Sequence, residues 1–264
     1  MNDARSGPEG IQMRIYGDPS RVTLIYLPGL HGDWTLIGRF RSAVAGCVRF
    51  VEFTYPRTLT WSLEDHASAI EKALMDGGIE KGWVLGESFG SQVAWPLCAR
   101  AKSFKAEGLI LANGFVRHPV VWGVRLAHRF NQGLSPASMR RMLRGYVRIA
   151  KFRQRRFPET LSNLDEFIER HNHLGFQAIG HRLDLIANND PSQMAQDLRL
   201  PVYYLAGAVD PLVPWPYVRW WLRRNCPGYC GGKIIWSADH AVLVSAPQAA
   251  AAQIFEWLGP HTSG

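Results

Sequence analysis

The sequence has few cysteines and no long hydrophobic run. Its 264 residues include four cysteines, Cys47, Cys98, Cys226 and Cys230. No apolar stretch approaches the ~18 to 20 residues that a membrane-spanning helix needs. The first ten residues are polar, so we expect no signal peptide. The cysteine spacing fits no zinc-binding pattern. We therefore expect a reduced, cytoplasmic protein that needs no metal; a Cys226–Cys230 disulfide is the less favoured alternative.

Acidic residues are missing from one long segment. The chain has 30 Lys and Arg against 22 Asp and Glu, a net charge of +8. Residues 117–156 contain 11 of the basic residues and no Asp or Glu, so the remainder has 19 basic against 22 acidic residues. The basic character is therefore local and needs a local explanation.

Short apolar runs separated by turn residues occur towards both ends of the chain. The predicted strands are residues 11–17, 22–27, 47–55, 82–86, 107–113, 201–207 and 233–238. The predicted helices are residues 63–75, which Ser62 would cap, 89–102 and 247–258. Strands that alternate with helices predict an α/β fold with a mostly parallel, doubly wound sheet.

Residues 115–196 interrupt this alternation, because they contain no comparable strand-like run. Ser135-Pro136 is a typical helix start. After it, an apolar stripe and an arginine face recur at helical spacing. The stripe comprises Met139, Met142, Leu143 and Tyr146, and the arginines are Arg140, Arg144 and Arg148. We expect residues 115–196 to form a helical insertion between two halves of a core, residues 11–114 and 197–264.

The pentapeptide Gly86-Glu87-Ser88-Phe89-Gly90 lies where a predicted strand ends and a helix begins. This is the context that a G-x-S-x-G nucleophile motif requires. The strained turn exposes the serine hydroxyl, and the two glycines leave room for the neighbouring strand and helix. A plain turn is the alternative interpretation for these five residues alone.

A nucleophilic serine needs a histidine base and an orienting carboxylate. Asp210 follows the predicted strand 201–207, and His240 follows the strand 233–238. Both therefore lie at the carboxyl ends of strands, as Ser88 does, where sites in open α/β sheets form. Asp184 in the insertion is the competing acid, whereas Asp239 is too close to His240 to orient it easily.

With these motifs, the chain resembles the α/β-hydrolase fold superfamily, in its lid-bearing esterase and thioesterase-like branch. The resemblance covers about 22–114 and 201–258, and the insertion corresponds to the variable cap. It implies that Ser88 is the nucleophile, Asp210 the acid and His240 the base, with no cofactor.

The resemblance also implies two backbone donors for the reaction's oxyanion. One is the amide of Phe89, after the nucleophile. The other comes from the loop after the first buried strand, which reads Leu-Pro-Gly-Leu-His-Gly-Asp-Trp over residues 27–34. Leu30 occupies the expected place. Because the family's His-Gly pair is shifted here, His31 is the alternative donor.

The resemblance predicts a serine hydrolase that acts on a carboxylic ester or thioester. The alternatives are an acyltransferase with the same triad and a ligand-binding protein without catalysis. His31, Trp34, Phe115 and Trp122 are candidate substrate-pocket residues, although core packing is the ordinary interpretation for a tryptophan. The apolar side chains in this part of the insertion favour a hydrophobic acyl group.

The basic segment has its own alternatives. The ordinary interpretation is a solvated helix face. Arginine forks could instead bind a phosphorylated carrier, coenzyme A or phosphopantetheine. An anionic membrane surface is the third interpretation. Nucleic acid is not expected, because no recognised binding motif accompanies the charge.

Overall fold

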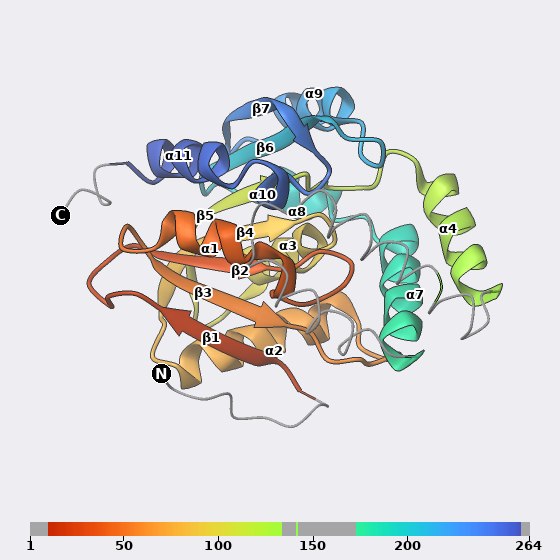
Figure 1. Ribbon diagram of the computed structural model, residues 1–264, viewed down its shortest axis with the longest axis horizontal. Coiled ribbons are helices and arrows are strands. Elements are labelled where there is room, and N and C mark those ends of the chain that lie inside the picture. Colours follow the sequence, from red (N-terminus) through yellow and green to blue (C-terminus); the bar gives the residue numbers. More distant parts are fainter. Residues whose placement is uncertain (1–9, 134–140, 142–172, 260–264) are drawn as a thin grey trace.

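A seven-stranded sheet forms the centre of the molecule (Figure 1). This computed structural model describes residues 10–133, 141 and 173–259. The strand order is β1-β3-β2-β4-β5-β6-β7, with β1 antiparallel to β3 and every other pair parallel. The strands are β1 (Gln12–Tyr16), β2 (Thr23–Leu27), β3 (Arg49–Thr54), β4 (Lys81–Glu87), β5 (Lys105–Ala112), β6 (Val202–Val209) and β7 (Tyr229–Asp239). The predicted mostly parallel, doubly wound sheet is confirmed.

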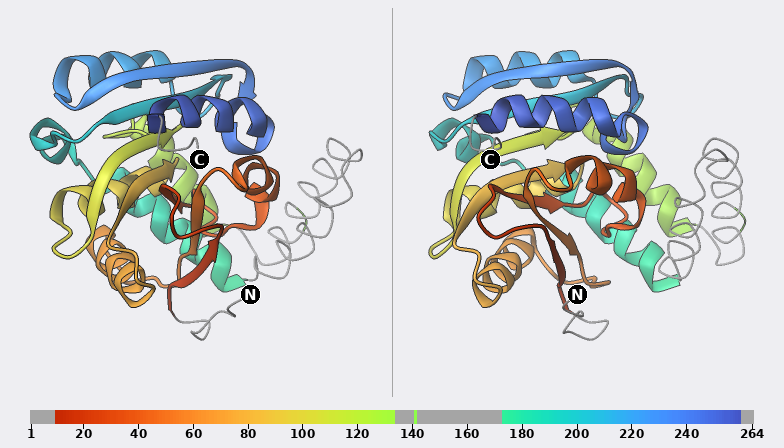
Figure 2. Two further views of the ribbon diagram at one scale, coloured as in Figure 1. Left: turned by 90° about the vertical axis from the view of Figure 1, so that its left-hand side faces the viewer. Right: turned by 60° about the vertical axis from the view of Figure 1, so that its left-hand side comes forward.

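Helices cover both faces of this sheet (Figure 2). One face carries α1 (Gly38–Val44), α10 (Val242–Ser245) and α11 (Pro247–Leu258). A short 3₁₀ helix, η1 (Thr35–Ile37), directly precedes α1. The other carries α2 (Leu63–Asp76), α3 (Gly90–Arg100), α8 (Ser192–Asp197) and α9 (Trp215–Asn225). The sequence predicted α2, α3 and α11 but missed α1, α8, α9 and α10. The central strands β2, β4 and β5 contain short apolar runs because both faces of the sheet are buried there.

The start of α2 follows from local sequence. The Ser62 hydroxyl accepts a hydrogen bond from the Asp65 amide, and the Asp65 carboxylate accepts one from the Ser62 amide. This reciprocal capping box satisfies two amides that the first helical turn leaves unpaired. The predicted cap at Ser62 is therefore confirmed.

Two described helices of the insertion lie beside each other at the carboxyl edge of the sheet (Figure 1). They are α4 (Val121–Gly133) and α7 (His173–Asn188). The helix predicted from Ser135-Pro136, with its apolar stripe and Arg140, Arg144 and Arg148, lies outside the described residues. The boundaries of the cap at residues 115 and 196 stay a prediction. Across the described ranges, no helix combines the length and apolar character needed to cross a membrane.

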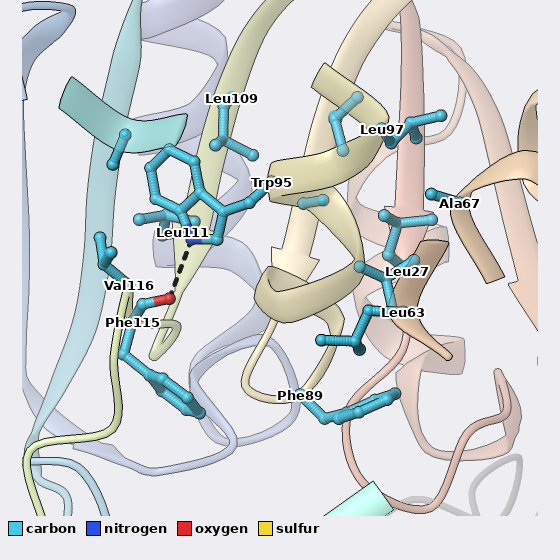
Figure 3. Close-up of a cluster of buried hydrophobic side chains, with 14 of the residues drawn as sticks. Leu27, Leu63, Ala67, Phe89, Trp95, Leu97, Leu109, Leu111, Phe115 and Val116 are labelled. Carbon is cyan, nitrogen blue, oxygen red and sulfur yellow. Dashed lines mark hydrogen bonds between the residues drawn. The ribbon is translucent and has the colours of Figure 1, made fainter. Parts of the chain in front are cut away.

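Side chains of helix α3 form hydrogen bonds to the segment after β5, where the insertion is predicted to begin. The Trp95 indole N–H donates to the Phe115 carbonyl at 3.0 Å, among the buried side chains of Figure 3. The Gln92 side-chain amide donates to the Phe115 and Val116 carbonyls, at 2.9 Å each. These buried bonds satisfy backbone oxygens outside any strand, and they fix the path by which the insertion begins.

Candidate active site

Ser88 occupies a strained turn between β4 and α3. Its φ is 48°, in the left-handed region that costs a non-glycine residue about 1–2 kcal/mol. Gly90 allows the turn to approach β2, because a Cβ there would lie 2.1 Å from the Leu27 carbonyl oxygen. At Gly86, a Cβ would lie 3.0 Å from Ser91 backbone atoms. The two glycines thus provide the room that the sequence motif predicted.

His240 reaches Ser88 from the loop after β7. Its Nε2 lies 2.9 Å from the Ser88 Oγ, and its Nδ1 lies 2.8 Å from the Asp210 Oδ2. A carboxylate only accepts hydrogen bonds, so Nδ1 carries the proton and Nε2 is free to accept the serine proton. The imidazole is therefore in the tautomer that a general base needs.

Asp210 is held by four donors. Its Oδ2 accepts from His240 and from the Asn113 side-chain amide at 2.7 Å, and its Oδ1 accepts from the Leu212 and Val213 amides at 2.8 and 3.0 Å. Burial alone would raise the pKa of Asp210, but the bonds from His240 and the two amides outweigh it and lower the pKa below its usual value. The carboxyl is thus ionised and fixed in orientation at neutral pH.

Asn113 is a site residue that the sequence analysis missed. It follows β5, is fully buried and has a φ of 48°. Its side-chain oxygen accepts from the Gly207 amide at 3.3 Å while its amide group donates to Asp210. An Asn-Gly pair directly after a buried strand was the available signal, because asparagine tolerates the left-handed region.

The predicted oxyanion donors are the amide of Phe89, the residue after Ser88, and that of Leu30, on a loop that passes close to Ser88. The Leu30 loop approaches the nucleophile, since a Cβ on Gly29 would lie 3.7 Å from the Ser88 Cβ. A turn closes this loop through a 2.9 Å bond from the Gly32 amide to the Gly29 carbonyl. Within the described part of the chain, the Leu30 and Phe89 amides donate no hydrogen bond. Leu30 and Phe89 stay the predicted donors, with His31 as the alternative to Leu30.

The other carboxylates near the motifs have different partners. Asp184 is exposed on α7 and accepts from the Asn188 side chain. Asp239 accepts from the Ala241 amide. Glu87 is buried beneath the turn and accepts from the Tyr26 hydroxyl at 2.5 Å, and burial raises the pKa of its carboxyl. It is Asp210, rather than any of these three carboxylates, that accepts the hydrogen bond from His240.

The four predicted pocket residues have different environments. Trp34 and Phe115 are each 1% exposed and belong to the core, so the ordinary interpretation describes them better than a place in a pocket. Trp122 is 72% exposed on α4, on the same stripe as the exposed Leu126 and Phe130. His31 is half-buried beside the Leu30 turn.

His118 also lies in the electrostatic environment of the site. Its Nδ1 accepts from the Val120 amide at 3.1 Å, so Nε2 carries the proton of the neutral ring. Burial, with a smaller contribution from the nearby His240, lowers the pKa of His118 to about 4. His118 is therefore a neutral donor at the entry to the insertion.

The described residues also bear on the expectations for metal ions and for the cysteines. Among them, no group of three or more His, Cys, Asp or Glu side chains could hold a metal ion. All four cysteines are free, including Cys226 and Cys230. Cys226 and Cys230 therefore do not form the disulfide that was the less favoured alternative.

Comparison with known proteins identifies the fold. No protein-family model matches the chain, and neither does any curated protein. A carboxylesterase structure from Nitrososphaera gargenis is 14% identical, with a TM-score of 0.76 over 98% of this chain and 99% of that one. An enol-lactonase from Burkholderia xenovorans LB400 is 15% identical, with a TM-score of 0.70 over 94% and 96%. An alpha/beta hydrolase enzyme from a Medee basin deep-sea metagenome library is 14% identical, with a TM-score of 0.72 over 94% of each chain. At these identities the likeness shows a shared fold. The chain therefore has the α/β-hydrolase fold that its motifs implied.

Proposed function

We propose that the protein is a serine hydrolase that cleaves a carboxylic ester or thioester through an acyl-enzyme. The observation that carries the proposal is the continuous hydrogen-bonded series from Ser88 through His240 to Asp210. The neighbours named carboxylesterase and enol-lactonase support the same reaction class, since a lactone is a cyclic ester.

In the proposed reaction, His240 Nε2 takes the Ser88 proton as Oγ bonds to the acyl carbon. The carbonyl oxygen becomes an oxyanion, which the Phe89 and Leu30 amides stabilise. Removing one such donor typically costs about 2.7–4 kcal/mol of activation free energy. The intermediate collapses as the acyl bond to the leaving group breaks, and His240 gives its proton to the departing alcohol or thiol. Water then attacks the acyl-enzyme with His240 as base, releasing the acid and restoring Ser88.

Labelling with a fluorophosphonate probe tests the activated serine. We expect labelling of the wild type and none in Ser88→Ala or His240→Ala, because the serine reacts only when His240 accepts its proton. Ser42→Ala, which changes an exposed serine on α1, is the matched control and should label normally. A folded wild type that does not label would favour the non-catalytic binding protein.

Acyl transfer differs from hydrolysis only in the final acceptor. Adding alcohols to an ester assay and separating the products measures how the acyl-enzyme partitions. Free acid as the main product would support hydrolysis, whereas a new ester as the main product would favour the acyltransferase.

Three sequence interpretations stay predictions. They are the preference between ester and thioester, the cytoplasmic location and the role of the basic segment. In the described part of that segment, Arg117 forms an ion pair with Asp190 at 3.3 Å, and α4 carries Arg125 and Arg129. A phosphorylated carrier and an anionic membrane surface both stay candidate partners of the segment.

A further inference from the structure

An arginine from the insertion is buried against the loop that carries the proposed oxyanion donor. Arg182 lies on α7 and is 3% exposed. Its guanidinium donates to the Leu30 carbonyl at 2.9 Å and to the Pro56 carbonyl at 3.2 Å. It also packs flat against Gly32, where a Cβ would lie 2.5 Å from Nη1. The Arg182 side chain therefore contacts the Leu30 turn at two residues, Leu30 and Gly32.

Through Tyr55, Arg182 is also linked to Phe89, the other proposed donor residue. The guanidinium carbon lies 5.5 Å from the centre of the Tyr55 ring, within the range of a cation–π contact. The Tyr55 amide donates to the Gly32 carbonyl at 2.8 Å, and its ring meets the Phe89 ring edge-on at 5.7 Å. Arg182 thus contacts the Leu30 loop directly and the Phe89 side chain through one intermediate ring.

The burial of this charge is expensive, and among the described residues the negative charge of the buried Asp33 offsets it only from a distance, without a direct ion pair. Within the described ranges, Arg182 forms no salt bridge; its hydrogen-bond acceptors are the two carbonyls. Burial lowers the pKa of Arg182 to about 10, so the guanidinium stays charged at neutral pH. Removing the guanidinium would leave the Leu30 and Pro56 carbonyls without this donor, which typically costs stability. The contacts of Arg182 therefore stabilise the Leu30 turn and, at the same time, set its position relative to α7.

We propose that Arg182 is a positioning residue that couples helix α7 of the insertion to the oxyanion donors. This inference rests on the proposed hydrolase function. The Leu30 carbonyl and the His31 amide belong to one planar peptide, so the bond from Arg182 sets the orientation of that peptide. Both candidate donors, Leu30 and His31, lie in the turn that Arg182 grips, and the inference holds for either.

The decisive comparison is between Arg182 and its neighbour on α7. Arg182→Met removes both bonds to the loop and keeps an apolar stem of similar length. His181→Ala is the matched control, because the His181 Nε2 donates to the Trp61 carbonyl at 2.9 Å. That contact also joins α7 to the core but does not touch the Leu30 loop. Arg182→Lys is the conservative variant, which can donate to one carbonyl but cannot bridge two in a planar fork.

The assay is hydrolysis of p-nitrophenyl butyrate, with inhibition by an alkyl boronic acid that forms a tetrahedral adduct on serine. For Arg182→Met we expect kcat to fall about 10- to 100-fold, somewhat less than the loss of a whole donor, with KM nearly unchanged. The inhibition constant of the boronic acid should rise by a similar factor, because its adduct needs the same donors. Arg182→Lys should recover part of the loss, and His181→Ala should retain kcat.

Three results would overturn the inference. One is an Arg182→Met enzyme with the kcat and boronic acid affinity of the wild type. Another is an equal loss in His181→Ala, which would indicate docking of α7 alone. The third is a rise in KM without a change in kcat, which would place Arg182 in substrate binding. A wild type that neither hydrolyses the ester nor labels with fluorophosphonate would instead overturn the proposed function, and this inference with it.

Discussion

The two loops beside Ser88 are held by different parts of the molecule. The Asp210 loop is held from within the sheet region, by Asn113 after β5 and by the amides of Leu212 and Val213. The Leu30 loop is held from the sheet region by the Tyr55 amide, which donates to the Gly32 carbonyl, and from outside it by Arg182 on α7. Among the described residues, the hydrogen bonds to Asp210 thus come from the sheet region and its loops, whereas the loop of the proposed oxyanion donor Leu30 is bonded to both the sheet region and α7. Changes in the cap should alter transition-state stabilisation without disturbing the triad.

The largest expected effect is at the core's own carboxylate. Asp210→Asn should lower kcat on the order of 10³- to 10⁴-fold, because an amide no longer fixes the imidazole tautomer or stabilises the imidazolium. The measurement is ester hydrolysis at neutral pH. Asp184→Asn and Asp239→Asn are matched controls and should keep near-normal kcat. A large loss in either control together with an active Asp210→Asn would move the acid role elsewhere.

A smaller effect is expected at the residue that holds the carboxylate. Asn113→Gly removes the donor to Asp210 but accepts the φ of 48° without strain. The loss of a hydrogen bond to a charged group, about 1.5 kcal/mol, predicts about a tenfold lower kcat with KM unchanged. Asn188→Ala, which removes an asparagine–aspartate bond on the exposed face of α7, is the control. Equal rates in Asn113→Gly and wild type would show that the backbone amides suffice to hold Asp210.

The free energy of unfolding should depend on pH through His66, which packs beside Phe89. This side chain lies edge-on to Tyr55 and Phe89, and burial lowers its pKa to about 4 although its bond to the Ser62 carbonyl opposes the shift. The unfolded chain, with an ordinary histidine pKa of about 6.5, therefore binds the proton first as the pH falls. The free energy of unfolding should decrease between pH 6.5 and 4, by up to about 1.4 kcal/mol per pH unit for this residue.

Urea unfolding of the wild type and His66→Leu over that pH range measures this dependence. The variant should show a shallower slope, whatever its stability at pH 7. It should keep part of the slope, because burial also lowers the pKa of His118 to about 4. Identical slopes in the two proteins would rule out His66 as a source of acid sensitivity.

The smallest expected effect concerns the strain at the nucleophile. Ser88→Gly should be about 1 kcal/mol more stable than Ser88→Ala, because glycine adopts a φ of 48° without the steric cost of a Cβ. Both variants lack the hydroxyl. The difference between their thermal unfolding temperatures therefore reports the steric cost of a Cβ at this φ. Equal stabilities would indicate that the turn relaxes when the hydroxyl is absent.

The sequence predicted the parts of the molecule that local rules determine. Hydrophobic runs predicted the seven strands, and Ser62 predicted the start of α2. The motif at Ser88 and the positions of Asp210 and His240 after strands predicted which side chains would meet. Short helices such as α1 and α10 were missed because packing on the sheet stabilises them more than any periodic pattern of their own.

Asn113 and Arg182, which the sequence did not single out, make their contacts at the candidate site across distant segments of the chain. Asn113 and Asp210 are 97 positions apart, and Arg182 and Leu30 are 152 apart. No spacing rule relates such pairs, so nothing in the sequence distinguished Arg182 from the other arginines of the insertion. Trp34 and Phe115, two of the candidate pocket residues, are buried in the core, which is the ordinary environment of an aromatic residue near a motif.

A crystal structure of the Ser88 phosphonate adduct would test most directly whether the core and the cap together build the site. We expect the phosphoryl oxygen to accept hydrogen bonds from the Phe89 amide and from the turn gripped by Arg182, at the Leu30 amide. His240 should stay on Asp210, and Arg182 on the Leu30 carbonyl. An adduct whose oxygen faces away from both loops, or an Arg182 detached from an otherwise intact site, would contradict this account.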